Sequence, residues 1–265
     1  MPILQQVIDH LHTIAPNHYQ ESYDNSGLLV GDSMAEVKGI VVSLDVTEAI
    51  LDEAISLGAN VIVSHHPIIF SGLKRIIGRN YVERIVAKAI KNDINLFSIH
   101  TNLDNVYDQG VNTHIASRLG MIDVQILKPN LDMNDNSKVG AGVIGLLETA
   151  TSEMAFLQDL KQRMNVSTIK YTALRERPIE RVAICGGSGR FLLEAAKAKN
   201  ADIFISSDFK YHEFFDADNQ IVIADIGHFE SEQYTINLLY EILTEKFNNF
   251  ATHFTKVNTN PVNYL

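Results

Sequence analysis

The chain has 265 residues, of which 46% are hydrophobic and 20% are charged, and its formal net charge is −10. This length can bury a sizeable core and could hold one large domain or two of about 130 residues. The acidic balance, without a run of Lys or Arg, argues against a nucleic-acid surface. No apolar stretch approaches the roughly 20 residues that cross a bilayer, and the start lacks a signal pattern. The single Cys185 fits a reducing compartment, so we expect a cytoplasmic protein with no membrane partner.

Helical and extended patterns alternate along the first part of the chain. The expected helices are 3–11, 47–57 and 81–92, and the expected strands are 28–30, 40–44, 61–63 and 95–99. Short links between these elements favour a mostly parallel sheet with helices on both faces. Right-handed crossovers would then place the ends of the strands on one edge.

A polar, turn-rich stretch at 129–138 is a predicted loop and a candidate boundary. Beyond it we expect strands at 139–147, 168–172, 181–185 and 221–226, and a helix at 152–164. A further helix should contain Glu232 in its first turns and run to about Leu243. The fold class is therefore α/β.

An internal repeat accompanies this pattern. Residues 39–67 align without a gap on 181–209, with apolar positions matching through strand, helix and strand. All βαβ units look alike, which is the simpler explanation, whereas the gapless match favours two related three-layer α/β halves. In the alignment His65 and His66 correspond to Ser207 and Asp208, so both halves offer polar groups at the same strand end.

We place the division between the halves at two points of the chain. The first half is expected at 1–128 plus 221–265 and should carry the metal ligands, and the second is expected at 129–220. A metal-binding cleft should lie between them, because ligands in α/β proteins collect at the ends of strands.

Three expected strands end in groups that bind transition metals. The residues are His65 and His66, His100 and Asp104, and His228 and Glu232. A mixture of imidazoles and carboxylates suits Zn, Fe, Mn, Ni or Co better than Ca or Mg, which prefer oxygen ligands. The predicted metal ligands are His65, His66, Asp104, His228 and Glu232.

The spacing of these residues supports convergence. Adjacent side chains of a strand point to opposite faces, so His65 and His66 can converge only where the strand has ended, as Pro67 indicates. They could then reach two different ions, which the carboxylate of Asp104 could bridge. His228 and Glu232 are four residues apart and share a helical face. His100 is either a ligand or a donor that orients Asp104.

Other polar features have simpler explanations. Gly186-Gly187-Ser188-Gly189 could present backbone N–H groups to a phosphate, but a tight strand-to-helix turn explains it as well and is preferred. Cys185 is expected in the core rather than as a nucleophile. Asp45, at the end of its own strand, could join the same crevice.

Five motifs, in order, resemble a known family. They are DNSGL at 24–28, SHHPIIF at 64–70, HTNLDN at 100–105, SSDFKYH at 206–212 and GHFESE at 227–232. Together they are similar to the GTP cyclohydrolase 1 type 2 homologs, called NIF-three-like in eukaryotes, over about residues 2–264. The resemblance implies two related α/β halves, a dinuclear centre held by the five ligands above, and a homohexamer built as a trimer of dimers. The cyclohydrolase activity in the family name is not carried over.

Two functions follow as hypotheses. In the first, two divalent ions hold a water and the protein hydrolyses a nucleotide or another phosphorylated small molecule. His100 and His212 would transfer protons, and Lys210 would meet a substrate anion. In the second, the protein is a non-catalytic metal-binding ring that acts as a scaffold or regulator. Open coordination positions, left when five ligands share two ions, favour catalysis.

Overall fold

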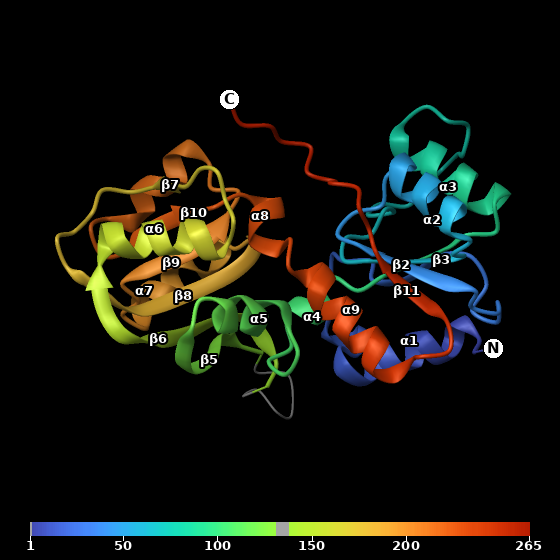
Figure 1. Cartoon of the computed structure of the whole chain (residues 1–265). Helices are drawn as coiled ribbons and strands as arrows, with labels where there is room; N and C mark the ends of the chain where they lie inside the picture. The colour runs from blue at the N-terminus through green and yellow to red at the C-terminus, as the bar shows by residue number, and fades with distance from the viewer. Residues whose placement is uncertain (1, 131–137) are drawn as a thin grey trace. The chain divides into compact units, whose positions relative to one another are not determined.

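The computed structural model describes residues 2–130 and 138–265. The chain folds into two compact units. Unit 1 comprises Met1–Leu103 and Thr235–Pro261, and unit 2 comprises Asp104–Tyr234 and Val262–Leu265. Each unit contains one β-sheet flanked by helices, which confirms the α/β class with two halves (Figure 1).

The sheet of unit 1 has the strand order β1-β4-β3-β2-β11. Its strands are β1 (Gly27–Val30), β2 (Gly39–Ser43), β3 (Val61–Ser64), β4 (Asn95–Ser98) and β11 (Ala251–Phe254). Strands β2, β3, β4 and β11 are parallel, and only β1 runs antiparallel to its neighbour. Ser43 pairs with Ser64 and Ser64 with Ser98, so three strands end at the same level. This mostly parallel sheet is the one that the sequence predicts.

Helices cover both faces of this sheet. Helices α1 (Leu4–Ile14) and α9 (Thr235–Lys246) lie on one face, and α2 (Glu48–Leu57) and α3 (Tyr81–Lys91) lie on the other (Figure 1). The short elements of this part of the chain are η1 (Asn17–Tyr19) and α4 (Thr101–Asp104). Helices α2 and α3 begin at the capping residues Thr47 and Asn80, whose side chains accept from backbone N–H groups three residues on.

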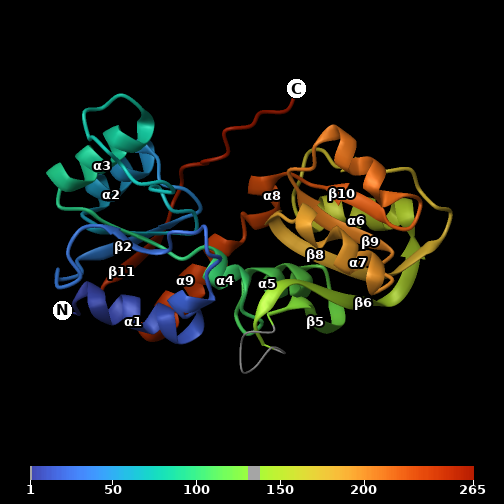
Figure 2. The same cartoon turned by 180° about the vertical axis from the view of Figure 1, so that it is seen from behind.

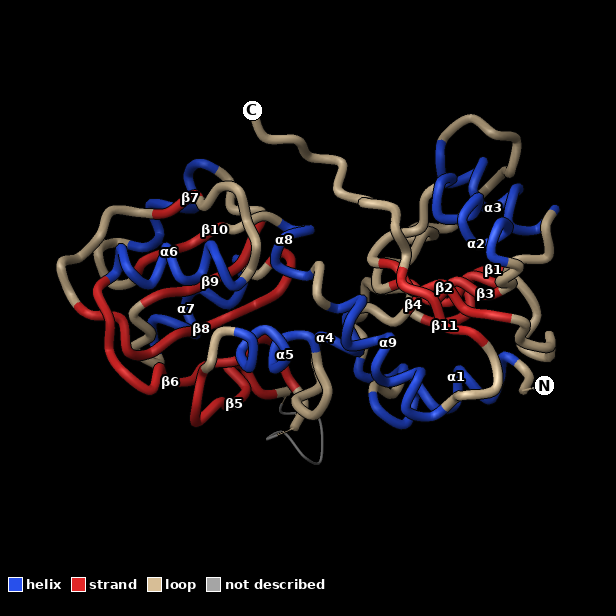
Figure 3. The backbone as a smooth tube through the Cα atoms, in the orientation of Figure 1, coloured by secondary structure: helices blue, strands red, loops and turns tan. Residues whose placement is uncertain are grey.

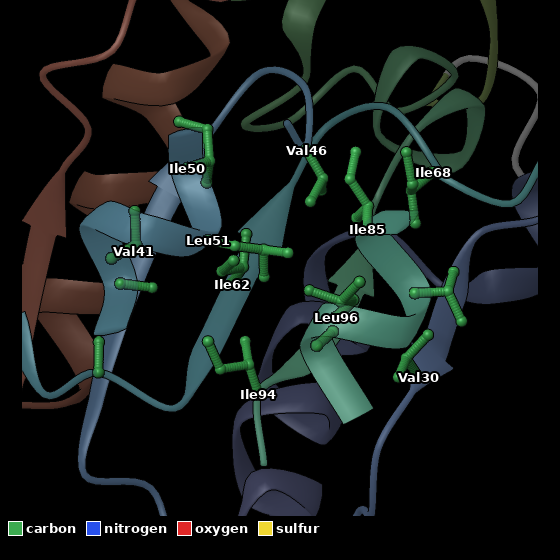
Figure 4. Packing of buried hydrophobic residues seen from close by; sticks show 14 residues of the cluster. Val30, Val41, Val46, Ile50, Leu51, Ile62, Ile68, Ile85, Ile94 and Leu96 are labelled. Atoms are coloured by element: carbon green, nitrogen blue, oxygen red, sulfur yellow. The ribbon is translucent and has the colours of Figure 1, made fainter. Parts of the chain in front are cut away.

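The core of unit 1 forms where aliphatic side chains of the parallel strands meet α2 and α3. Val41, Ile62 and Leu96, from three neighbouring strands, pack with Leu51 and Ile85 from the two helices (Figure 4). Alternate residues of a strand face opposite sides of a sheet, so the side chains of each buried strand pack against the helices on both faces. This packed core holds the ends of β2, β3 and β4 in place, and so determines where the loops after these strands begin.

The sheet of unit 2 has the order β5-β6-β8-β9-β10-β7. Its strands are β5 (Met121–Pro129), β6 (Gly140–Ser152), β7 (Lys170–Tyr171), β8 (Pro178–Ser188), β9 (Ile203–Ser207) and β10 (Val222–Asp225). Only the β8–β9 and β9–β10 pairs are parallel. The expectation of a mostly parallel sheet is therefore wrong for this unit. Consecutive strands β5 and β6 pair directly and antiparallel, without the helical crossover that a parallel pair requires.

The helical elements of unit 2 are α5 (Val111–Arg118), α6 (Glu153–Arg163), α7 (Leu193–Ala198), α8 (His228–Glu232), η2 (Arg190–Leu192) and η3 (Tyr211–Ala217). Helices α6 and α7 lie on opposite faces of the sheet, as the front and rear views show (Figures 1 and 2). A core cluster between the sheet and α7 includes Ala183, Cys185, Leu193 and Phe204. The prediction that Cys185 is a core residue is confirmed, because its side chain is buried there.

The division between the units differs from the expected boundaries at 128/129 and 220/221. The chain changes unit at 103/104 and 234/235 instead, and again at 261/262. The reason is pairing within the second sheet, because β5 pairs with β6 and β10 pairs with β9. As a consequence the predicted ligands do not all lie in the first half. Asp104, His228 and Glu232 belong to unit 2.

The expected single helix through Glu232 to about Leu243 is also interrupted. Helix α8 ends at Glu232 and α9 begins at Thr235, and the chain passes from unit 2 to unit 1 between them. After β11 the chain has neither helix nor strand, as the loop colouring of Figure 3 shows. Most of the loop predicted at 129–138 lies outside the described residues. In the parts that are described, no helix has the length and apolar character needed to cross a membrane.

Candidate metal-binding residues

Three histidines of unit 1 form one cluster. His65 and His66 follow β3, and His100 follows β4, two parallel strands that end at the same level. Each imidazole offers one ring nitrogen such that these atoms lie within 4.8 Å of one another. Their ring centroids are 5.0 to 5.3 Å apart. Three imidazoles at such distances are a ligand set for a divalent transition metal.

The main chain orients the first of these rings. His65 is buried, and its Nδ1 donates to the carbonyl of Ile99 over 2.9 Å. The backbone N–H groups of His65 and His66 donate to the carbonyls of Ser43 and Leu44, so the sheet pairing continues past the end of β3. Because Nδ1 of His65 carries the proton, its Nε2 has the lone pair that a metal would use.

His66 is oriented by a carboxylate from the neighbouring strand end. Its Nδ1 donates to Oδ1 of Asp45 over 2.8 Å. The other oxygen of Asp45 accepts from Oγ1 of Thr259 at 2.7 Å. Burial opposes ionisation of Asp45, but the hydrogen bond and charge of His66, together with Thr259, lower the pKa of this carboxyl below its usual range. Asp45, considered from the sequence as a possible member of the crevice, thus braces a predicted ligand.

His100 has a similar brace from the DNSGL motif. Its Nδ1 donates to Oδ1 of Asp24 over 2.8 Å, and the side chain of Asp24 is fully buried. Thr101 donates to Oδ2 of Asp24 from both its backbone N–H and its hydroxyl, and Ser26 donates to the same oxygen. Burial alone would raise the pKa of Asp24, but the hydrogen bond and charge of His100, together with hydrogen bonds from Thr101 and the backbone of Asn25, lower it well below its usual range. His100 therefore has the geometry of a ligand, which the sequence left open.

The fourth imidazole lies in unit 2. Nδ1 of His228 donates to Oδ2 of Asp208 at 2.7 Å, and its Nε2 lies 3.2 Å from Oε2 of Glu232 on the same helix. Burial lowers the pKa of His228, but the hydrogen bonds and charges of Asp208 and Glu232 outweigh it and raise that pKa to about 11. A positive charge is therefore strongly favoured beside Glu232, and a metal cation would supply it in place of the proton.

The glycine run explains how Glu232 comes so close to the sheet. Gly187 has a φ of +64°, and a Cβ at this position would clash with Oε1 of Glu232. The backbone N–H of Gly187 donates to Oγ of Ser231 at 2.9 Å, which fixes α8 against β8. Gly187 lies within β8 rather than in the strand-to-helix turn that the sequence predicts for this motif, and the absence of a side chain there makes room for a carboxylate.

Asp104 is placed by a short chain of hydrogen bonds within unit 2. Its backbone carbonyl accepts from Nδ2 of Asn112, and Oδ1 of Asn112 accepts from the N–H of Gly186. The charges of Asp104 and Glu232 both act on Cys185. Burial raises the pKa of the Cys185 thiol far above its usual range, and these two carboxylates raise it further. This region of unit 2 is therefore rich in negative charge and suited to a cation.

The remaining predicted residues lie elsewhere in unit 2. Lys210 precedes η3, where its backbone N–H donates to Glu213. The ring of His212 contacts Tyr211 and stacks on Phe215, with centroids 5.0 and 6.3 Å apart. Among the described residues, neither belongs to a group of metal-ligand type. Their roles in proton transfer and anion binding stay predictions.

Four imidazoles in two units thus have one ring nitrogen fixed by a carbonyl or carboxylate, the arrangement typical of metal-binding histidines. The fold and these residues place the chain in a class of proteins: two-unit α/β proteins that carry clusters of histidines and carboxylates at the ends of sheet strands. Comparison with known proteins gives the family. The model of the Duf34/NIF3 (NGG1p interacting factor 3) family matches residues 2–261, so the chain belongs to this family.

Relatives and solved structures agree with this assignment. A Campylobacter jejuni protein named GTP cyclohydrolase 1 type 2 homolog is 34% identical over 232 residues, covering 87% of this chain and 88% of its own. A Staphylococcus epidermidis protein of the same name is 26% identical over an alignment that covers 98% of this chain and 99% of its own. A Staphylococcus aureus hypothetical protein of known structure has a TM-score of 0.89 at 29% identity and covers 99% of both chains. The Bacillus cereus protein related to NIF3 shares the fold, with a TM-score of 0.90 at 24% identity over 100% of this chain and 99% of its own.

Proposed function

We propose that this protein is a metal-dependent hydrolase with a dinuclear centre, acting on a nucleotide or another phosphorylated small molecule. One observation carries the proposal. His65, His66, His100 and His228 each have Nδ1 fixed by a carbonyl or carboxylate oxygen. A ring held in this way has its tautomer set for metal binding through Nε2, which is the arrangement that metal-binding histidines use.

In this proposal the ligands of unit 1 and those of unit 2 bind the same pair of ions. His100 and Asp104 are only four residues apart in the chain although they belong to different units, and Glu232 lies three residues before the start of α9, which belongs to unit 1.

The ligands would be His65, His66, Asp104, His228 and Glu232, with His100 as a sixth. Two divalent ions, when bound, supply Lewis acidity and lower the pKa of a coordinated water. Asp45, Asp24 and Asp208 hold the imidazoles in position, and Gly187 leaves room for Glu232. Phosphate oxygens are the substrate groups that paired cations attract most strongly, which is why phosphate esters are the proposed substrates. Zn, Fe, Mn, Ni and Co all suit this ligand set.

The experiment has two stages. Purified protein should contain up to two divalent metal ions per chain by elemental analysis, and His65→Ala combined with His66→Ala should lose most of them. His18→Ala is the control and should retain them, because the ring of His18 contacts the neighbouring Tyr19 and belongs to no metal-ligand group among the described residues. An unchanged metal content in the double variant would refute the site.

The second stage is a turnover screen with nucleotides and phosphate esters. The metal-loaded protein should hydrolyse at least one of them, and Glu232→Ala should abolish the activity. Binding without turnover would support the alternative of a non-catalytic scaffold or regulator. The homohexamer that the family resemblance implies is part of the same proposal, and sedimentation of the full chain measures it directly.

A further inference from the structure

A second concave site lies on unit 2 and takes no part in holding the proposed ions. It is a cavity of about 620 Å³ between β7 with the residues after it and the 3-10 helix η3. Its walls carry four aromatic rings, from Tyr171, Tyr211, Phe214 and Phe215. This volume falls within the range of pockets for small molecules, roughly 300–1,000 Å³.

Three of the rings are exposed to solvent, and the fourth packs against the core of unit 2. The exposed fractions are 74% for Tyr211, 68% for Phe215 and 45% for Tyr171. Tyr211 and Phe215 contact edge to face with centroids 5.7 Å apart. Phe214 packs on Phe209 of the core, with centroids 5.5 Å apart. Exposed rings on a rigid backing provide flat apolar surface, and a planar ring that stacks on them would remove that surface from water.

The two ends of the cavity differ in polarity. At one end the ammonium of Lys170 lies 2.7 Å from Oδ2 of Asp225. Asp225 also accepts from the backbone N–H of Gly227, the residue before His228. Asp218 and Asn219, which follow η3 and precede the start of β10, also line the cavity, whereas Lys170 pairs with Asp225 at the end of β10. The Lys170–Asp225 ion pair is therefore connected through Gly227 to the predicted ligand His228.

We propose that this cavity binds the nucleobase of a nucleotide. Every base has a π face that stacks on Tyr or Phe rings without requiring a particular sequence of donors and acceptors. Asp218 and Asn219 offer acceptor and donor groups for the polar edge of the base. Lys170 marks the direction of the phosphate, because it lies at the end from which Asp225 and Gly227 lead to His228. Binding of the base does not depend on the proposed hydrolase activity. The position of the phosphate near the metal ligands does rest on the function proposed above.

The test is calorimetric titration of the full chain, freed of metal by a chelator, with four nucleosides and their 5′-monophosphates. At least one nucleoside should bind, and Tyr211→Ala and Phe215→Ala should each weaken it about tenfold or more. Phe215→Tyr, which keeps a ring, should retain the affinity. Phe191→Ala is the matched control, since Phe191 is 52% exposed on the same unit but does not line the cavity. Unchanged circular dichroism would show that each variant is folded.

The outcomes separate this inference from the proposed function. The His65→Ala and His66→Ala double variant should lose metal but bind the nucleoside with unchanged affinity. If no nucleoside binds the chelated protein, while protein that was not chelated contains the metal and hydrolyses a phosphate ester, the cavity assignment is overturned and the hydrolase stands. If nucleosides bind but metal does not, the cavity stands and the hydrolase fails. If Tyr211→Ala alters the sedimentation coefficient and leaves nucleoside affinity unchanged, the rings contact a second copy and the inference is overturned.

Discussion

Nε2 of His228 lies 3.2 Å from Oε2 of Glu232, one turn later on α8, while Asp208 holds the opposite nitrogen of the same ring. An imidazole between two carboxylates retains its proton far above the ordinary pKa of 6.5, up to about 11. In the metal-free protein this proton compensates the negative charge. When a metal cation binds His228 and Glu232, it would replace this proton and supply the positive charge.

This arrangement predicts how the stability of the metal-free protein depends on pH. A pKa raised in the folded state means that folded His228 binds more protons than unfolded His228 above pH 6.5. Its stabilising effect is complete below pH 6.5 and is lost as the pH rises toward about 11. Thermal unfolding of chelated protein between pH 6 and 9 should therefore show a falling Tm. His228→Gln should flatten this fall, and a Tm that rises over the same interval in the original chain but not in the variant would contradict the prediction.

Gly187→Ala tests the close approach of Glu232 to β8. The new Cβ would meet the carboxylate and would also occupy a left-handed backbone conformation, so we expect a loss of about 1 kcal/mol or more in unfolding free energy. Metal affinity should fall at least tenfold. Gly58→Ala is the matched control, because Gly58 has a φ of +68° with no atom within 4 Å of the added Cβ. It should lose similar stability and keep its metal, and equal metal loss in both would reject the clash as the cause.

Asp24→Asn tests the brace on His100. The single amide oxygen can accept either from His100 or from the N–H and hydroxyl of Thr101, so the amide nitrogen faces a buried donor in both orientations and one of these hydrogen bonds is lost. We expect a destabilisation of about 1–3 kcal/mol and a drop in metal affinity of about 10- to 100-fold. Chemical denaturation and competitive metal titration measure the two effects. Asp52→Asn, at an exposed ion pair with Lys88, should change stability by at most about 1 kcal/mol and should leave metal binding intact.

Cys185 should be inert in the folded protein. Burial and the charges of Asp104 and Glu232 raise the pKa of its thiol, so the reactive thiolate is scarce at pH 8. Labelling with a thiol reagent should be slow in native buffer and complete after denaturation. Fast labelling of the folded chain would show that this part of unit 2 is open to solvent.

The sequence predicts much of this structure because the residues at the strand ends are local signals. His65, His66 and His100 directly follow apolar strands, and the strands, helices and α/β class follow from the same patterns. The supporting roles of Asp24 and Asp208 were missed because they depend on tertiary register. Asp24 lies 76 residues from His100, and Asp208 lies 20 residues from His228.

The unit boundaries could not be derived from local patterns either. One boundary falls inside the short helix α4, between Leu103 and Asp104, and another follows two residues after α8. Neither point is marked by a long Gly-, Pro- or Ser-rich linker, because each lies inside or directly beside a short helix. Strand β11 was not predicted because its four residues gain their structure by pairing with β2, which lies more than 200 residues earlier.

The most direct test of a shared dinuclear centre is an anomalous difference map from a crystal grown with Zn²⁺. We predict two peaks per chain, with Nε2 of His66 and Nε2 of His228 both within coordinating distance of that pair of ions. Peaks bound by residues of only one unit, or none beside these imidazoles, would contradict the account.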